Sequence, residues 1–385
     1  MKPFEFATAQ RIMFGRGKLA ELSSLTEPLG NSTCVVTGAS GRFFDRVTEI
    51  LEPNGTKTHR FSVAHEPEVD HIVAGCRFAA EHHCKSVIAI GGGSALDAGK
   101  AIAALSTNPG APTDYLELVG KGLPLKNQPA PFIAIPTTSG TGAEVTKNAV
   151  LSVPEQRVKV SLRSAAMLPT VAIVDPELTD KLPRLVTAQT GLDALTQLIE
   201  PLISCRSNPF TDALCRAAIP LAFNALKALN HDPQSPSARD DLAYAALSSG
   251  MALANSGLGA VHGFAGPMGG MFNVPHGALC ARLLPFAFQT NYQAIRRQAQ
   301  YHDMLSRFDE VGQLLTGNPT AKATDAIKAL TEISQQLHIP GLASLGITAA
   351  DISEIIPKAK KASSMKGNPL PLTDEELAEI LELAL

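Results

Sequence analysis

The sequence lacks the features that define several large classes of protein. Its 385 residues contain no stretch of about 18 consecutive apolar residues, the length that a transmembrane helix needs. The amino terminus has no basic segment followed by an apolar run, so no signal peptide is expected. The six cysteines include no CxxC pair, which argues against a disulfide framework and indicates a reducing compartment. We therefore expect a cytoplasmic protein with no membrane partner.

An excess of charge of either sign is also missing. The chain has 33 Lys and Arg against 36 Asp and Glu, a net charge of -3, so it offers no field that would attract nucleic acid. Two standard phosphate-binding patterns, GxGxxG and GxxxxGK[ST], are absent as well. What remains is a chain of mixed composition that is long enough for two domains.

The pattern of apolar residues differs between the two halves of the chain. Between residues 33 and 174, short β-branched runs alternate with helix-like segments, which predicts a mostly parallel α/β sheet. After residues 171–176, long Ala- and Leu-rich segments with helical periodicity continue to the end. We place the boundary near residues 182–184, which predicts an α/β domain over 1–183 and an all-helical domain over 184–385.

A glycine-rich turn stands at the strongest strand-to-helix junction. Residues 86–90 predict a buried strand, 91–94 a tight turn, and 95–105 a helix. Backbone N–H groups of such a turn, at the positive end of a helix, favour a phosphate. A second strand, 131–135, runs into the hydroxyl- and glycine-rich loop 137–142. Two such loops at neighbouring strand ends could contact the two sides of one bound dinucleotide.

Asp193 is an acid in an otherwise apolar helical segment. Leu192, Leu195 and Leu198 recur at helical spacing and should face a core, so the carboxylate needs a metal or a buried cation as partner. His262 and His276 lie downstream in a glycine-rich stretch. One carboxylate and two imidazoles form a sensible ligand set for zinc or iron(II).

Four motifs in this order carry a family resemblance. They are GGGSALDAGK at residues 91–100, PTTSGTGAEVT at 136–146, Gly191-Leu192-Asp193, and His262 with Pro275-His276-Gly277. Together they resemble the iron-containing, or group III metal-dependent, alcohol dehydrogenase family. The likeness runs from Ile12–Gly15, through Asp175-Pro176, to Asn368-Pro369 before the last predicted helix.

The resemblance implies a fold and a set of ligands. It implies a Rossmann-like parallel-sheet domain that binds NAD(P), an all-helical domain, a divalent metal, iron or zinc, in the cleft between them, and assembly into a homodimer or a larger homo-oligomer. Carried over by motif, the cofactor-binding residues are Gly92, Gly93, Ser94 and Asp97 at the pyrophosphate and nicotinamide, Thr137, Thr138, Thr141 and Thr146 on the opposite wall, and Lys159 toward the ribose.

Two positions depart from the family pattern. Members with an iron site typically use one Asp and three His, but the position four residues after Asp193 is Gln197, whose amide oxygen is a weaker ligand for a transition metal. Asp193, His262 and His276 still resemble the set of glycerol dehydrogenases, with Gln197 completing the metal shell or hydrogen-bonding substrate. The second departure is Gly266, where many members have another histidine; it leaves room for a bulkier or more polar substrate, unless close helix packing requires it.

The loop after the first predicted strand bears on the choice of cofactor. NAD sites often have an acid there, which binds the ribose 2'-hydroxyl and repels a 2'-phosphate. This loop, Thr37-Gly-Ala-Ser-Gly-Arg42, has none. Because Gly38 leaves room and Ser40 and Arg42 can donate hydrogen bonds, the loop favours NADP over NAD.

The reaction that we expect is reversible hydride transfer between a small-molecule alcohol and the nicotinamide, with the metal as Lewis acid and His262, His276 and Gln197 as the catalytic set. Three alternatives stay open. In the first, the histidines and Gln197 bind an acidic carbonyl substrate without metal, as in proteins similar to maleylacetate reductases. A lyase similar to dehydroquinate synthase is disfavoured by the 136–146 motif. The third is a non-catalytic nucleotide-binding protein. Cys280, four residues after His276, could lie near the site, but the interpretation as a small buried hydrophobic residue is favoured.

Overall fold

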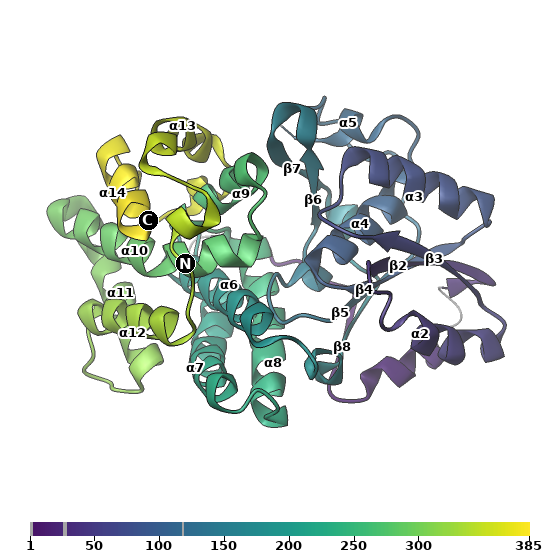
Figure 1. Cartoon of the computed structure of the whole chain (residues 1–385), viewed down its shortest axis with the longest axis horizontal. Helices are drawn as coiled ribbons and strands as arrows, with labels where there is room; N and C mark the ends of the chain where they lie inside the picture. Colours follow the sequence, from purple (N-terminus) through teal and green to yellow (C-terminus); the bar gives the residue numbers. More distant parts are fainter. Residues whose placement is uncertain (1–2, 26–28, 118) are drawn as a thin grey trace. The chain divides into compact units, whose positions relative to one another are not determined.

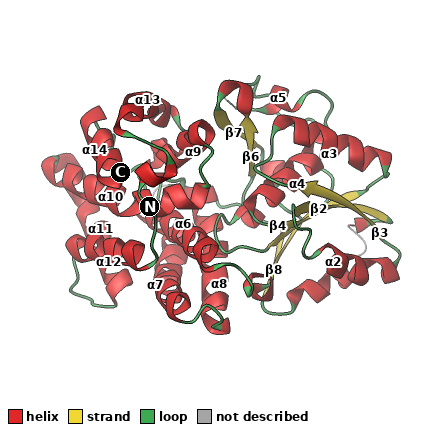
Figure 2. Cartoon of the chain, in the orientation of Figure 1, coloured by secondary structure: helices red, strands yellow, loops and turns green. Residues whose placement is uncertain are grey.

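Parallel strands and long helices occupy different parts of the chain (Figures 1 and 2). The computed structural model describes residues 3–25, 29–117 and 119–385. The α/β unit comprises residues 7–138 and 142–181, and the helical unit comprises residues 3–6, 139–141 and 182–385. The predicted fold class, a Rossmann-like parallel sheet followed by a helical half, is confirmed. None of the helices formed by the described residues has both the length and the apolar character that crossing a membrane requires.

Six parallel strands form the sheet of the α/β unit, in the order β1-β8-β5-β4-β2-β3. β4 is buried along its whole length, as its apolar run predicted for a parallel sheet covered on both faces. The strands are β1 Arg11–Phe14, β2 Ser32–Gly38, β3 Lys57–Val63, β4 Ser86–Gly91, β5 Phe132–Pro136 and β8 Val171–Val174. The helices are α2 Phe44–Leu51, α3 Val69–Glu81, α4 Gly93–Leu105 and α5 Pro112–Tyr115.

The strand register brings the predicted phosphate-binding turns to one edge of the sheet. Gly91, the last residue of β4, pairs with Pro136 at the end of β5, and Thr37 of β2 pairs with Ile90. The turn after β4 therefore lies between the loops that follow β2 and β5. This is the edge at which open α/β sheets bind their ligands.

A two-stranded hairpin that the sequence analysis did not identify is fastened to α4. Its strands are β6 Asn148–Val153 and β7 Val158–Arg163, which pair antiparallel. The buried Lys100 donates hydrogen bonds to the carbonyls of Ala143 and Asn148, at 2.7 and 2.8 Å. Asp97 accepts a hydrogen bond from the N–H of Val150 at 3.0 Å. The polar residues of α4 thus hold the hairpin by its backbone.

α6 is the helix against which much of the helical unit packs. It contacts α7, α8 and α10, and its residues from Gly191 to Ile203 are all buried. The helices of this unit are α6 Arg184–Ile203, α7 Pro209–His231, α8 Pro236–Ser256, α9 Ala260–Phe272, α10 His276–Arg297, α11 Leu305–Thr316, α12 Ala323–Gln336, α13 Ile352–Lys361 and α14 Asp374–Ala384.

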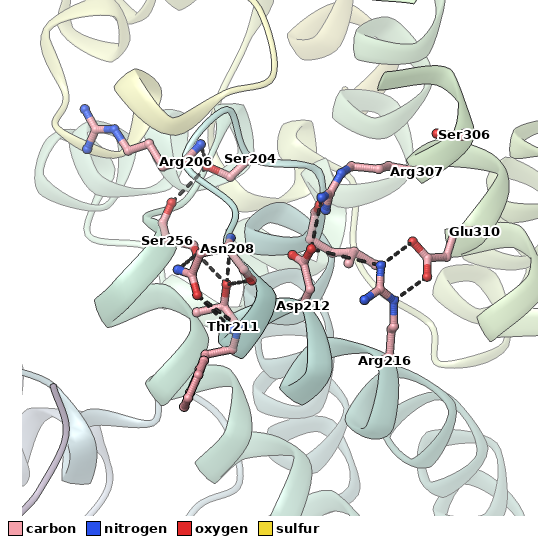
Figure 3. Close-up of polar contacts among 12 residues, drawn as sticks. Ser204, Arg206, Asn208, Thr211, Asp212, Arg216, Ser256, Ser306, Arg307 and Glu310 are labelled. Atoms are coloured by element: carbon pink, nitrogen blue, oxygen red, sulfur yellow. Dashed lines mark hydrogen bonds and ion pairs between the residues drawn. The ribbon is translucent and has the colours of Figure 1, made fainter. Parts of the chain in front are cut away.

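Polar contacts fix the start of α7 relative to its neighbours (Figure 3). Asn208 caps the helix by accepting hydrogen bonds from the N–H groups of Phe210 and Thr211, at 3.1 and 3.2 Å. One turn on, Asp212 pairs with Arg307 of α11 at 2.9 Å. The same guanidinium donates to the carbonyl of Leu202 at 2.7 Å, so a single arginine joins α6, α7 and α11.

We predict that the Asp175→Ala variant lowers the free energy of unfolding by at least about 4.5 kcal/mol, since it removes three hydrogen bonds to a charged acceptor and each is worth about 1.5–3 kcal/mol. The carboxylate is buried after β8 and accepts from the N–H groups of Gly17, Leu19 and Glu177. Urea unfolding followed by circular dichroism measures the loss. Asp175→Asn, which keeps one acceptor oxygen, should lose less; equal losses would contradict the role of the hydrogen bonds.

Candidate active site

Three polar side chains of α6 occupy one face of the helix. Asp193, Gln197 and Glu200 are spaced four and three residues apart, which places them one above another. All three are buried, and Asp193 is only 1% exposed. The partners that the buried Asp193 requires come from α9 and α10.

His262 of α9 lies between two carboxylates. Its Nε2 is 3.2 Å from Oδ1 of Asp193, and its Nδ1 is 2.6 Å from Oε2 of Glu200. An Nδ1–H that donates to Glu200 fixes the ring orientation and turns Nε2 toward Asp193. The sequence analysis did not assign a role to Glu200.

The first turn of α9 is held by residues far away in the chain. Gly259 precedes the helix and has no side chain to cap it. Instead, Glu200 Oε1 accepts a hydrogen bond from the N–H of Val261 at 2.8 Å, and Asn368 Oδ1 accepts one from the N–H of Ala260 at 3.0 Å. Because helix N–H groups at this end lack partners within the helix, these contacts fix the position of His262.

His276 and Cys280 enter from the first turns of α10, four residues apart and therefore on one face. His276 Nε2 lies 3.8 Å from Oδ1 of Asp193. Gly277 permits this approach, since a Cβ at that position would lie 2.9 Å from the carbonyl oxygen of Gln189 in α6. Ligand atoms of Asp193, His262, His276 and Cys280 all lie within 4.8 Å of one another.

The charges of this cluster call for a cation. Burial would raise the pKa of Asp193, but the His276 and His262 rings outweigh it and the pKa is lowered. Burial would likewise lower the pKa of His262, yet Cys280, Glu200 and Asp193 raise it well above the usual value. Protonated His262 would supply one positive charge to two buried carboxylates. A divalent cation at Nε2 would take the place of that proton and supply more charge.

Gln197 and Gly266, the two departures from the family pattern, have different surroundings. The hydroxyl of Ser249, on α8, lies 3.1 Å from Oε1 of Gln197, so the amide oxygen already has a polar neighbour. A Cβ added at Gly266 would meet nothing within 4 Å, whereas one at Gly263 would lie 2.6 Å from Met365. Close packing therefore accounts for Gly263 but not for Gly266.

The predicted cofactor residues of the α/β unit gather at the carboxyl edge of its sheet. Gly92, Gly93 and Ser94 begin α4, and a Cβ at Gly92 would be 3.5 Å from Thr138. Thr137 donates its N–H to the carbonyl of Gly91 at 2.9 Å. This brings the glycine turn beside the threonine loop.

Other predicted cofactor residues have internal partners. Asp97 accepts from the hairpin, and burial raises its pKa to about 6 despite the nearby Lys100. Thr146 Oγ1 accepts a hydrogen bond from Lys100 at 3.0 Å. Lys159 of β7 forms an ion pair with Glu66. Thr141 belongs to the short segment 139–141 of the helical unit.

The loop after β2 presents a different arginine from the one that its sequence indicates. Arg42 donates to the carbonyl of Leu178 at 2.8 Å and stacks on the ring of Phe43. Arg60 of β3 instead lies along the loop, donating to Thr37 Oγ1 and to the carbonyl of Ala39, each at 3.1 Å. Its position 23 residues beyond Thr37 hides this neighbour from local sequence reasoning. A Cβ at Gly38 would meet nothing within 4 Å.

Comparisons with known proteins cover nearly the whole chain. Residues 9–176 match the model of "Iron-containing alcohol dehydrogenase", and residues 187–385 match "Fe-containing alcohol dehydrogenase family, C-terminal". A 1,3-propanediol dehydrogenase of Klebsiella pneumoniae is 31% identical over 99% of this chain and 98% of its own length. An NAD-dependent methanol dehydrogenase of Bacillus methanolicus is 31% identical over 97% of each. A crystal structure of 1,3-propanediol oxidoreductase superposes with a TM-score of 0.92 at 31% identity, covering all of both chains.

We predict that the Glu200→Gln variant weakens binding of Zn²⁺ to the cluster by about 10- to 100-fold, the usual cost of losing the partner that orients a ligating histidine. The variant keeps the side-chain shape but removes the charge beside His262. Calorimetric titration of the metal-free protein measures the affinity. Glu376→Gln, at another buried glutamate of the same unit, is the matched control. Equal affinities for both variants would contradict an orienting role for Glu200.

Proposed function

The chain belongs to the iron-containing alcohol dehydrogenase family, and on that premise we propose how its residues carry the reaction. The protein is an oxidoreductase that interconverts an alcohol and an aldehyde or ketone by hydride transfer with a nicotinamide dinucleotide. In our proposal the α/β unit binds the dinucleotide and the helical unit holds a divalent metal. The observation that carries the metal assignment is the convergence of Asp193, His262 and His276 from three helices.

These three residues fit a divalent cation in chemistry and in charge. A carboxylate and two imidazoles are the ligands that catalytic zinc and iron sites use. Both carboxylates at His262 are buried, so a cation there relieves the cost of burying negative charge. When bound, such a metal supplies a Lewis acid for the substrate oxygen, and the dinucleotide supplies or accepts the hydride.

The side chains around the metal have separate tasks. With its Nδ1–H donated to Glu200, His262 would have the lone pair of Nε2 available to hold the metal. His276 has a side chain that is 35% exposed, so the cluster opens to solvent on its side. Gln197 lies one helical turn from Asp193 and is proposed to hydrogen-bond the substrate or to complete the metal shell. The open space at Gly266 allows a substrate bulkier or more polar than ethanol.

For the dinucleotide we propose the edge where β2, β4 and β5 end. Backbone N–H groups at Gly92, Gly93 and Ser94 begin α4 and suit a pyrophosphate. Thr137 and Thr138 line the adjoining loop. Asp97, Thr141, Thr146 and Lys159 stay in the proposed set through their motif positions. Mutation of this edge is expected to change dinucleotide affinity without changing metal content.

We further propose NADP over NAD as the preferred cofactor. The loop after β2 carries no acid, Gly38 and Ser40 bear no charge, and Arg60 adds a guanidinium along the loop. An arginine near the ribose is the usual means of accommodating a 2'-phosphate. A cytoplasmic location and a homodimeric or larger assembly also stay predictions.

We predict that the His262→Ala variant, or chelation of the wild-type protein, lowers aldehyde reduction by at least about 100-fold, because a Lewis acid contributes several kcal/mol and each ~1.4 kcal/mol is a factor of ten. Turnover of NAD(P)H with a panel of aldehydes, before and after chelation, measures it alongside elemental analysis. Zinc or iron should restore the chelated wild type but not the variant. Chelator-resistant turnover without bound metal would instead favour direct binding of an acidic carbonyl substrate by the histidines.

We predict that the Gly38→Asp variant shifts the ratio of NADPH to NADH affinity toward NADH by about tenfold or more. A carboxylate there gains a hydrogen bond to the 2'-hydroxyl and repels a 2'-phosphate, and a charged hydrogen bond is worth about 1.5–3 kcal/mol. The position has space for the side chain. Titrations that follow dinucleotide fluorescence measure both affinities. Arg60→Ala should weaken NADPH alone; an unchanged ratio in both variants would contradict this placement of the ribose.

A further inference from the structure

The side chain of Cys280 lies beside two of the proposed metal ligands, His262 and His276. Its sulfur lies 3.7 Å from Nε2 of His262 and 3.5 Å from Nε2 of His276, and the residue is fully buried. Resting on the metal site of the proposed function, we propose that Cys280 binds the metal as a thiolate and is its fourth protein ligand. This assignment replaces the interpretation of Cys280 as a small hydrophobic residue.

The spacing of the donors is that of a four-coordinate site. Ligands held about 2.0 to 2.3 Å from one ion at tetrahedral angles lie about 3.3 to 3.8 Å from one another. Asp193 Oδ1 is 3.2 Å from His262 Nε2 and 3.8 Å from His276 Nε2. The two distances from the sulfur, 3.7 and 3.5 Å, fall within this range, and the 3.2 Å separation lies just below it. A cation can therefore contact all four residues with small adjustments of their side chains.

Cys280 also replaces the histidine ligand that the family pattern has at position 197, where this chain has Gln197. Gln197 offers an amide oxygen, which has the Ser249 hydroxyl at 3.1 Å. A thiolate is the stronger ligand for a borderline cation. The donor missing from α6 is thus supplied by α10, one helical turn after His276.

A thiolate in place of an imidazole strengthens the preference of the site for Zn²⁺ over iron(II). Soft sulfur ligands favour Zn²⁺ over the harder divalent cations. Zn²⁺ usually has four ligands and can accept a fifth during a reaction. The site of this chain is therefore a zinc site rather than an iron(II) site. Each ion that binds displaces to solvent the thiol proton of Cys280 and, where His262 is protonated, the proton on its Nε2, with no change in oxidation state.

The test uses Co²⁺ as a spectroscopic substitute for Zn²⁺ in the full-length protein. Metal-free protein is loaded with Co²⁺ under anaerobic conditions, and a thiolate-to-cobalt charge-transfer band is sought in the near ultraviolet. The band is expected in the wild type, lost in the Cys280→Ala variant, and kept in Cys215→Ala, the matched control at a buried cysteine of α7. Zinc affinity of Cys280→Ala should fall by more than the ~10- to 100-fold that loss of an outer partner costs.

Each result decides between the two proposals. Cobalt bound to the wild type with visible bands but no charge-transfer band would overturn the role of Cys280 and leave the metal site intact. No cobalt or zinc bound to the wild type would overturn the metal site and the thiolate together. The wild-type spectrum decides even if Cys280→Ala does not fold. A preference for iron(II) over Zn²⁺ in competition would contradict the assignment of the metal.

Discussion

A carboxylate buried in an apolar helix requires positive charge nearby, and the helical unit is built to provide a place for it beside Asp193. Burying an unpaired charge costs far more than a typical protein can lose, so Asp193 is tolerable only with partners. α9 and α10 bring those partners to it, and α7 and α8 cover the remainder of α6. Packing of α6 therefore brings the residues of the site together, and their charges in turn allow Asp193 of α6 to be buried.

The cluster depends on contacts that are remote in sequence. Glu200 serves two groups at once, the ring of His262 and the N–H of Val261, so it sets both where the helix begins and which ring nitrogen is available. Gly277 sets how closely α10 approaches α6. Neither residue is a proposed ligand, yet the distances among the ligands follow from them. Positioning in this site is thus shared between helix ends rather than supplied by one loop.

The sequence was sufficient to predict those features that depend on a single residue type or on one hydrophobic periodicity. An acid among leucines and two histidines in a glycine-rich stretch identified residues that the structure brings together, and the apolar run of β4 predicted a covered parallel strand. The sequence was not sufficient for features that depend on how closely two helices approach each other in the folded protein. Cys280 looks like any small buried residue until α10 is placed against α6, and Glu200 looks like a polar residue near a helix end. The hairpin β6–β7 has a local signal, alternating burial along β6 before a turn that begins at Pro154, which the sequence analysis did not use; its attachment to Lys100, far earlier in the chain, has no such signal.

The capping of α9 by Asn368 has a consequence for the order in which the protein matures. During synthesis, every proposed ligand has been added to the chain once residue 280 is made, but Asn368 has not. Until that asparagine arrives, the N–H of Ala260 lacks its acceptor and the turn that carries His262 lacks part of its support. The proposed cation would therefore find its complete set of supporting contacts only in the nearly complete chain, and a nascent or truncated chain would carry the donors with part of that support missing.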